Sequence, residues 1–257
     1  MPALPRKNSL SYKLRHAVRH PNRIFPYFAM TWRNYWYART SRDPVEQHRR
    51  YIEAYGRSGM NLAVGSDSEQ HWLEFGRTQF DYLRQHGLQP QDQVLEIGCG
   101  NLRLGWRLTE FLEAGHYTGL DISPTMLDEA RRRISERGLE AKRPNLFLVD
   151  KIDYSFLPAE KFDWINSYAV FTQTPYQTIM SMLGAAAPLL KPGGRFDFTY
   201  FECAGKPYVF RNINFYYPRG MIAAAIAPTG LRAEWVTDWP TADEQVKVRL
   251  TKPPVST

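Results

Sequence analysis

The sequence predicts an α/β fold, a doubly wound and mostly parallel sheet preceded by an N-terminal helical extension. Two observations carry this prediction. Short apolar runs alternate with amphipathic segments of helical length over most of the chain, a pattern that favours parallel strands joined by crossover helices. The first 65 or so residues differ, because they are rich in Arg and aromatic residues and are broken into short pieces by prolines.

The extension is expected to form short helices. The segments Ser11–His20 and Tyr27–Arg39 each have the length and composition of a helix. Asp43 followed by Pro44 is a typical helix start, an N-cap residue before a proline at the first helical position, and it leads into Val45–Tyr55. Glycines then mark loops up to the next periodic segment.

The division into regions follows from this change in composition and periodicity along the chain. Residues 1–67 are predicted to be a basic, aromatic-rich extension or cap, and residues 68–257 to be the catalytic domain. The domain begins with an amphipathic helix from Ser68 to about Gly87, and the further elements follow in alternation. The expected strands are Val94–Ile97, His116–Asp121, Leu146–Val149, Phe162–Ser167, Arg195–Phe201, Leu231–Thr237 and Gln245–Thr251. The expected helices between them are Asn101–Leu112, Pro124–Arg137, Tyr176–Leu190 and Pro218–Ala227.

Two of these connections carry further topological information. A turn at Pro192–Gly194 is expected to lead into the strand that begins at Arg195. The last two strands are joined by a loop without a helix, which predicts an antiparallel pair at the sheet edge.

Composition excludes several classes of protein. The chain of 257 residues has two cysteines, Cys99 and Cys203, which cannot form a disulfide framework and lack partners at metal-site spacing. We therefore expect a reducing, cytoplasmic setting and no metal site. The sequence contains no run of about 18 apolar residues, so no membrane-spanning helix is expected. No apolar segment typical of a secretory signal follows the basic N-terminus.

The positive charge is concentrated at the N-terminus. Residues 1–50 contain eleven Lys or Arg against two acidic residues, so the rest of a chain of net charge +7 carries about −2. Arg interleaved with aromatic residues such as Trp32 and Trp36 suits a helical lid over the site. It also suits peripheral contact with an anionic membrane, and less readily single-stranded nucleic acid.

The clearest motif joins a buried strand to a glycine turn. Gly98 and Gly100 let the backbone turn sharply and approach a ligand closely. A dinucleotide-binding turn would place a third glycine at position 103, where this chain has Arg103. Glu96 lies two residues before the first glycine and suits a ligand that carries an ammonium and a sulfonium rather than a pyrophosphate.

Two further acidic positions follow the next strands. Asp121 lies 21 residues after Gly100, the spacing of an acid that accepts hydrogen bonds from both ribose hydroxyls. Ile122 and Met126 are expected to pack against an adenine ring, and Asp150 to accept from the adenine amine, although Asp153 is an alternative for that contact.

These motifs together resemble the class I S-adenosylmethionine-dependent methyltransferase family. The segments VLEIGCGNLRLG, GLDIS, FDWINSYAVFT and LKPGGRF carry the resemblance, which covers roughly residues 68 to 251. It implies a Rossmann-like seven-stranded sheet whose seventh strand is antiparallel, with S-adenosylmethionine as cofactor and S-adenosylhomocysteine as product. The cofactor contacts expected on this basis are Glu96, Gly98, Cys99, Gly100, Asp121, Ile122, Met126, Asp150 and Ser167.

Catalytic residues are harder to predict, because methyl transfer depends mainly on alignment and on exclusion of water. The family resemblance implies a His after the Phe-Thr pair, but this chain has Gln173, which cannot take up a proton. Glu202 and Asp153 are therefore candidate bases, and Tyr168 is the third candidate catalytic residue. Tyr154, Tyr168, Phe171 and Tyr200 are expected to wall the pocket, with a place in the core as the alternative for Tyr168 and Phe171.

The expected activity is methylation of a small-molecule, sugar or lipid acceptor at oxygen. The segment Asn166–Ala169 lacks the prolines of the turn used for exocyclic amines, and neither cysteine suits cytosine C5 methylation. A small-molecule N-methyltransferase and a non-catalytic binding protein of the same fold stay open as alternatives, with a nicotinamide-dependent oxidoreductase disfavoured by Glu96 and Arg103. The sequence does not determine the oligomeric state.

Overall fold

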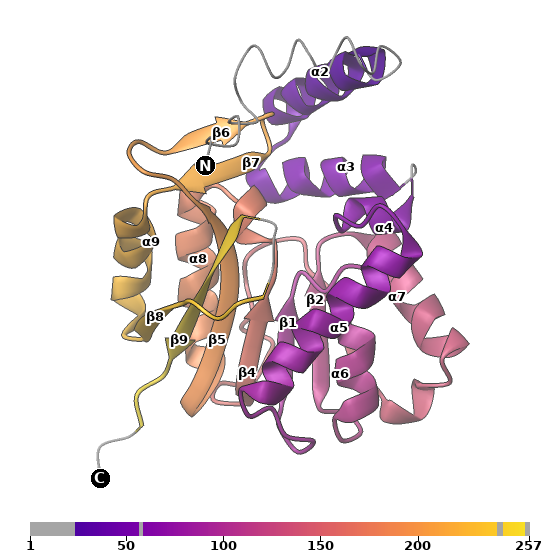
Figure 1. Ribbon diagram of the computed structural model, residues 1–257, viewed down its shortest axis with the longest axis vertical. Helices are drawn as coiled ribbons and strands as arrows, with labels where there is room; N and C mark the ends of the chain where they lie inside the picture. The colour runs from indigo at the N-terminus through magenta and orange to yellow at the C-terminus, as the bar shows by residue number, and fades with distance from the viewer. Residues whose placement is uncertain (1–23, 57–58, 241–243, 255–257) are drawn as a thin grey trace, which may run out of the picture.

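The computed structural model describes residues 24–56, 59–240 and 244–254. A central sheet is covered by helices on both faces, and further helices lie across one of its ends (Figure 1). The helices are α2 (Ile24–Thr40), α3 (Pro44–Gly56), α4 (Met60–Ala63), α5 (Glu69–Gln85), α6 (Gly105–Phe111), α7 (Pro124–Glu136), α8 (Tyr176–Ala186) and α9 (Arg219–Ile226). The strands are β1 (Val94–Ile97), β2 (Tyr117–Asp121), β3 (Asn145–Leu148), β4 (Phe162–Ser167), β5 (Leu190–Glu202), β6 (Tyr208–Phe210), β7 (Asn214–Tyr217), β8 (Arg232–Val236) and β9 (Gln245–Thr251).

The sheet has the expected mixed topology. The strands β3, β2, β1, β4 and β5 are neighbours in that order and run parallel. The strand β9 pairs antiparallel with β5 from Arg195 to Phe201, and β8 pairs antiparallel with β9. The predicted doubly wound sheet with an antiparallel edge pair is therefore confirmed.

The sheet contains nine strands among the described residues, not the seven that were predicted. The two extra strands, β6 and β7, form a hairpin, and β7 continues the sheet beside the end of β5. Arg211 and Asn212 both adopt left-handed backbone angles in its turn, with φ of 56° and 58°. The sequence carries no glycine at this turn, so the usual hairpin signal is absent.

Several predicted boundaries are corrected in detail. The helix expected from Asn101 begins only at Gly105, because Leu102 has a φ of 63° and holds the glycine turn out of helical conformation. The helix expected to reach Leu190 ends at Ala186 and continues as a 3-10 turn around Pro188. The turn at residues 192–194 lies within β5, which begins at Leu190. The expected helix Ser11–His20 lies outside the described residues.

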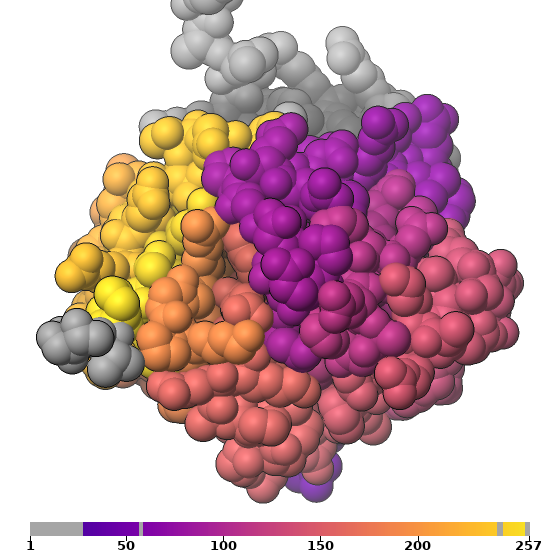
Figure 2. All heavy atoms as spheres, turned by 90° about the horizontal axis from the view of Figure 1, so that it is seen from below, coloured from indigo at the N-terminus to yellow at the C-terminus, as the bar shows by residue number. Residues whose placement is uncertain are grey.

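Two apolar cores, one on each face of the sheet, hold the helices in place. One core joins β4, β5 and β9 to α8 and α9, and the other joins β1 and β2 to α5, α6 and α7. Seen from below, α5 lies against the C-terminal strands on one side and against the α6–α7 region on the other (Figure 2). None of the helices that the structure describes has the length and apolarity needed to span a membrane.

The extension forms helices as predicted. Asp43 accepts the N–H of Glu46 at 2.8 Å and so acts as the predicted N-cap of α3, with Pro44 at the first position. The helix α3 lies across the ends of the central strands, and α2 lies farther from the sheet, near the β6–β7 hairpin (Figure 1). The division of the chain at residue 67 stays a prediction.

Candidate functional site

A cavity of about 570 Å³ lies at the carboxyl ends of the central strands. Its walls come from the turns after β1, β2 and β4, from the end of β5, and from one face each of α3 and α5. Ligands of open α/β sheets bind at this edge, where the strand order reverses between β1 and β4. The cavity is large enough for a nucleoside-sized ligand together with a small acceptor.

Asp121 ends β2 at the cavity wall and is almost fully buried. Its two carboxylate oxygens accept the N–H groups of Gly100 and Ser123, each at 2.8 Å. Burial raises the pKa of Asp121 to about 6, while these backbone hydrogen bonds act in the opposite direction. A carboxylate has further acceptor positions, so Asp121 can still accept from the hydroxyls of a ligand.

Glu96 is a buried carboxyl group at the cavity wall. The Tyr117 hydroxyl donates to Glu96 Oε2 at 2.6 Å, and no ion pair satisfies this carboxyl among the described residues. Burial raises the pKa of Glu96 to about 8. Arg103, which lines the same cavity, acts on this pKa in the opposite direction. A buried acid suits a ligand that brings its own positive charge.

The glycine turn of the motif is crowded by two valines. A Cβ on Gly98 would lie 2.4 Å from Val170, and one on Gly100 would lie 2.8 Å from Val64. Both glycines also have positive φ values, 77° and 53°. Glycine at these positions therefore allows both the turn and the close approach of neighbouring groups.

Most of the residues predicted to contact the cofactor lie around one cavity. Its lining includes Glu96, Gly98, Cys99, Gly100, Asp121, Ile122 and Met126. Two predicted contacts lie elsewhere. Asp150 is exposed to solvent beyond the end of β3, and the Ser167 hydroxyl is buried and donates to the Ile97 carbonyl at 3.2 Å.

The candidate catalytic residues are separated by the fold. Tyr168 lines the cavity, where its ring packs against Phe75 with the centroids 5.2 Å apart. Glu202 is not among the lining residues, because its carboxylate pairs with Arg219 and accepts from the Tyr200 hydroxyl. Asp153 is also outside the lining and accepts from the Ser155 hydroxyl at 2.6 Å.

The aromatic positions divide between wall and core. Tyr154 and the polar Gln173 line the cavity with Tyr168. Phe171 and Tyr200 are fully buried in the core instead.

The helix α3 contributes a wall that the sequence analysis did not identify. Val45, His48 and Ile52 lie on one face of this helix and line the cavity. Their spacing of three and four residues is the signal that could have found them, since it places a histidine between two apolar residues on one helical face.

Polar contacts fix α3 over the turns after β2 and β3. The Arg49 guanidinium donates to the carbonyls of Ile122 and Val149 at 2.7 and 3.4 Å. Glu53 accepts from the hydroxyls of Ser123 and Thr125. The extension is therefore an integral part of the cavity wall.

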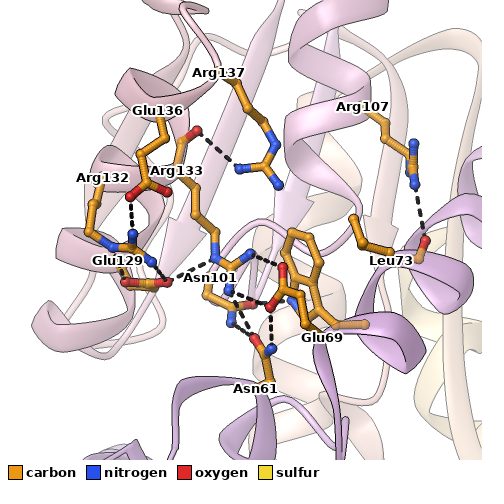
Figure 3. Close-up of polar contacts among 11 residues, drawn as sticks. Asn61, Glu69, Leu73, Asn101, Arg107, Glu129, Arg132, Arg133, Glu136 and Arg137 are labelled. Carbon is orange, nitrogen blue, oxygen red and sulfur yellow. Dashed lines mark hydrogen bonds and ion pairs between the residues drawn. The ribbon is translucent and has the colours of Figure 1, made fainter.

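A second network braces the glycine turn from behind (Figure 3). The buried Arg133 guanidinium donates to Glu69 and Asn61 at 3.0 Å and to Glu129 at 2.9 Å. Asn101, directly after the turn, donates to Asn61 at 3.0 Å and accepts from the Trp72 indole at 2.8 Å. This network joins α4, α5 and α7 to the residue that follows Gly100.

Comparisons with known proteins agree with this site. Residues 95–196 match a family model described as a methyltransferase domain. A ubiquinone biosynthesis O-methyltransferase of Nitrosococcus oceani is 30% identical over 145 residues, which cover 53% of this chain and 55% of that protein. A malonyl-[acyl-carrier protein] O-methyltransferase of Ilyobacter polytropus is 28% identical over 155 residues, 57% of this chain and 54% of that protein. The chain thus spans about half the length of these curated relatives.

Solved structures share the fold at lower sequence identity. Magnesium protoporphyrin IX methyltransferase from Synechocystis with bound S-adenosylmethionine superposes with a TM-score of 0.63 at 17% identity, covering 83% of this chain and 99% of that one. A geranyl diphosphate methyltransferase gives a TM-score of 0.56 at 14% identity, covering 72% of this chain and 80% of that one. These matches, with the motif order and the sheet topology, show a methyltransferase domain over residues 95–196 and the class I methyltransferase fold, and solved structures that share this fold hold S-adenosylmethionine or S-adenosylhomocysteine.

Proposed function

We propose that the protein transfers the methyl group of S-adenosylmethionine to a hydroxyl oxygen of a small-molecule, sugar or lipid-linked acceptor. The observation that carries this proposal is the buried Glu96 beside the Gly98–Gly100 turn, at the wall of a cavity that has room for two ligands. A neutral or anionic ligand gives no compensation for burying this carboxyl group, whereas a cationic ligand does.

The cofactor half of the cavity has a distinct role for each residue. Glu96 faces the positively charged part of the cofactor. The backbone of Gly98, Cys99 and Gly100 contacts the cofactor closely, because the two glycines have no side chain in the way. Asp121 accepts from the ribose hydroxyls, while Ile122 and Met126 pack against the base. The bound cofactor supplies an activated methyl group on a sulfonium, and the chain's own residues hold the acceptor in line with it and exclude water.

The acceptor half lies between α3, α5 and the turn after β4. Aromatic and aliphatic side chains of Phe75, Tyr168 and Ile52 line it, with Gln173 and Gln245 as uncharged polar groups. The Arg103 guanidinium lies over the rings of Phe75 and Tyr168, 4.6 and 5.3 Å from their centroids. A pocket with apolar walls, a few amide groups and one cation suits an aromatic or aliphatic acceptor that carries hydroxyl groups. The two curated relatives given above are both O-methyltransferases, which supports oxygen as the methylated atom.

The test is calorimetric titration with S-adenosylmethionine, followed by measurement of S-adenosylhomocysteine with a set of acceptors. The set contains a phenol, a carboxylic acid, a sugar and a long-chain alcohol, and matched primary amines. Micromolar cofactor binding with turnover of a hydroxyl compound supports the proposal. Turnover confined to amines would assign the protein as an N-methyltransferase, and binding without any turnover would indicate a non-catalytic member of the fold.

We also propose peripheral contact with an anionic membrane through α2. This helix contains no acidic residue, and Phe28, Trp32 and Trp36 are each more than half exposed. Trp32 and Trp36 lie one turn apart with their rings 5.8 Å from each other. Exposed Trp beside Arg33 and Arg39 is the composition of an interfacial helix that binds anionic headgroups.

Co-sedimentation with vesicles tests the membrane contact. We expect binding to vesicles that contain phosphatidylserine, weakened by salt and by the double variant Trp32→Ser/Trp36→Ser. Equal binding of both proteins, or no binding of the wild type at low salt, would contradict the proposal.

A further inference from the structure

His48 lies where two cavities meet. It lines the main cavity and also a second cavity of about 20 Å³, which is enclosed by α2, α3 and the β6–β7 hairpin. Its ring stacks on Tyr51 of the same helix, with the centroids 6.1 Å apart and the planes 16° apart. The imidazole is thus held between a small polar hole on one side and the ligand cavity on the other.

The two nitrogens of His48 have different surroundings. Nδ1 is enclosed and has no hydrogen-bond partner among the described residues, whereas Nε2 is not enclosed. The ring keeps an intermediate exposure, which it owes to the cavity that it lines. A ligand in the main cavity can therefore reach the imidazole.

Asn34 supplies a matching unpaired group on the far side of the small cavity. Its Oδ1 is buried and has no partner among the described residues, while its Nδ2 donates to the Arg211 carbonyl at 3.4 Å. Asn34 and His48 both line the small cavity, whose volume is sufficient for one water molecule. A water in this cavity would accept from Nδ1–H and donate to Asn34 Oδ1, and this arrangement would fix the tautomer that leaves Nε2 as an acceptor.

The surroundings also keep the imidazole neutral. Burial lowers the pKa of His48 to about 4. The titratable neighbours around the small cavity are Tyr37 and Tyr51, and no charged side chain lines it in the part of the chain that the structure describes. At neutral pH the imidazole therefore presents a lone pair to the main cavity.

Gln173 borders the same cavities as His48 but cannot act as a base. It lines both cavities, as His48 does, and comes from the turn after β4. An amide cannot take up a proton, and the carboxylates of Glu202 and Asp153 lie outside the cavity lining. His71 also lines the main cavity, but its Nδ1 lies 3.1 Å from Asp67 Oδ1 and its side chain is about half exposed. His48 is the histidine that borders both cavities.

We propose that His48 is the catalytic base of the methyl transfer, an inference that rests on the proposed function. As the acceptor oxygen forms its bond to the methyl carbon, the carbon–sulfur bond breaks with its electron pair left on sulfur, and the acceptor proton passes to His48 Nε2. One positive charge disappears from sulfur and one appears on the imidazole, so the net charge of the enclosed site stays constant. A weakly basic, desolvated imidazole can therefore gain basicity as the reaction proceeds.

Two measurements on the full chain test this role. In protein labelled with ¹⁵N-histidine, one imidazole, absent from His48→Gln, should remain neutral with the proton on Nδ1 between pH 5 and about 8. With an acceptor from the set above, His48→Gln should lower kcat by about 100-fold or more at unchanged S-adenosylmethionine affinity. His116→Gln, a histidine outside both cavity linings, is the matched control and should retain the wild-type rate.

A rescue experiment distinguishes a role of His48 as proton acceptor from a role in packing alone. Because Gln173 borders the same two cavities, the double variant His48→Gln/Gln173→His should recover at least tenfold of the lost rate. Full activity of His48→Gln, or a neutral imidazole that carries its proton on Nε2, would overturn the role of His48 alone. A wild type that binds the cofactor and methylates no acceptor would overturn the proposed function itself.

Discussion

The cofactor half and the acceptor half of the cavity are built in different ways. The cofactor half comes from two adjacent strands and the turns that follow them, with Glu96, Gly98 and Asp121 within 26 residues of one another. The acceptor half is assembled from segments far apart in the chain, such as His48, Phe75, Gln173 and Gln245. The cofactor turn is braced from behind by the network of Figure 3, whereas the acceptor half is closed by α3.

The difference reflects two tasks, since the cofactor to be bound is always the same whereas the acceptor varies between methyltransferases. A single cofactor can be bound by a short motif whose geometry is set by strand pairing and backbone conformation. An acceptor of particular shape requires side chains from several elements, which can change without disturbing the sheet. Variants in the two halves should therefore differ in what they lose, either the fold and cofactor affinity or the rate with acceptor.

The largest effect is expected for the brace of the cofactor half. Arg133→Met removes a buried guanidinium that pairs with Glu129 and Glu69, and breaking such a buried pair costs about 3 kcal/mol. Urea unfolding should show this loss, together with weaker S-adenosylmethionine binding, because Arg133 holds Asn61 against Asn101. Arg131→Met is the control on the same helix and should change little, because Arg131 pairs with the exposed Asp128. Equal losses for both variants would contradict a specific bracing role.

The next effect is a loss of cofactor affinity at Asp121. Asp121→Ala removes the expected partner of the ribose hydroxyls and should weaken binding by about 1–3 kcal/mol. Asp150→Ala provides the comparison at the following strand, and its exposed position predicts unchanged affinity. Titration calorimetry measures both. If Asp150→Ala lost as much cofactor affinity as Asp121→Ala, the result would support the contact between Asp150 and the adenine amine that the sequence predicts.

The same contrast explains which parts of the fold and of the site could be predicted from the sequence. The seven expected strands were all found because they are short apolar runs, most of which alternate with segments of helical period. The β6–β7 hairpin was missed because its turn uses Arg211 and Asn212 where a glycine would signal it. Glu202 was a plausible base by its position at a strand end, but its ion pair with Arg219 depends on a residue 17 positions away. His48 was missed because nothing local to α3 indicates that its face meets the turn after β4.

A smaller effect concerns proton uptake by Glu96. With a pKa of about 8 in the ligand-free protein, Glu96 is mostly protonated at pH 7. A cationic cofactor lowers this pKa, so binding should release up to about one proton, and affinity should rise with pH until Glu96 is ionised in the free protein. Calorimetry in two buffers of different ionisation enthalpy counts the protons. Glu96→Gln should release none, whereas Tyr117→Phe should still release one. Release that persists in Glu96→Gln would assign the proton to another group.

The smallest effect is a pH dependence of stability that belongs to the acceptor half. The pKa of His48 is about 4 in the folded protein and about 6.5 in an unfolded chain. As pH falls from 6.5 towards 4, the unfolded chain binds a proton that the folded protein does not, so the free energy of unfolding decreases. His48→Gln lacks this proton, and its stability relative to wild type should increase over this window while the difference stays constant above pH 7. Urea unfolding at pH 5 and pH 8 measures the difference, and parallel profiles would show that α3 leaves His48 open to water.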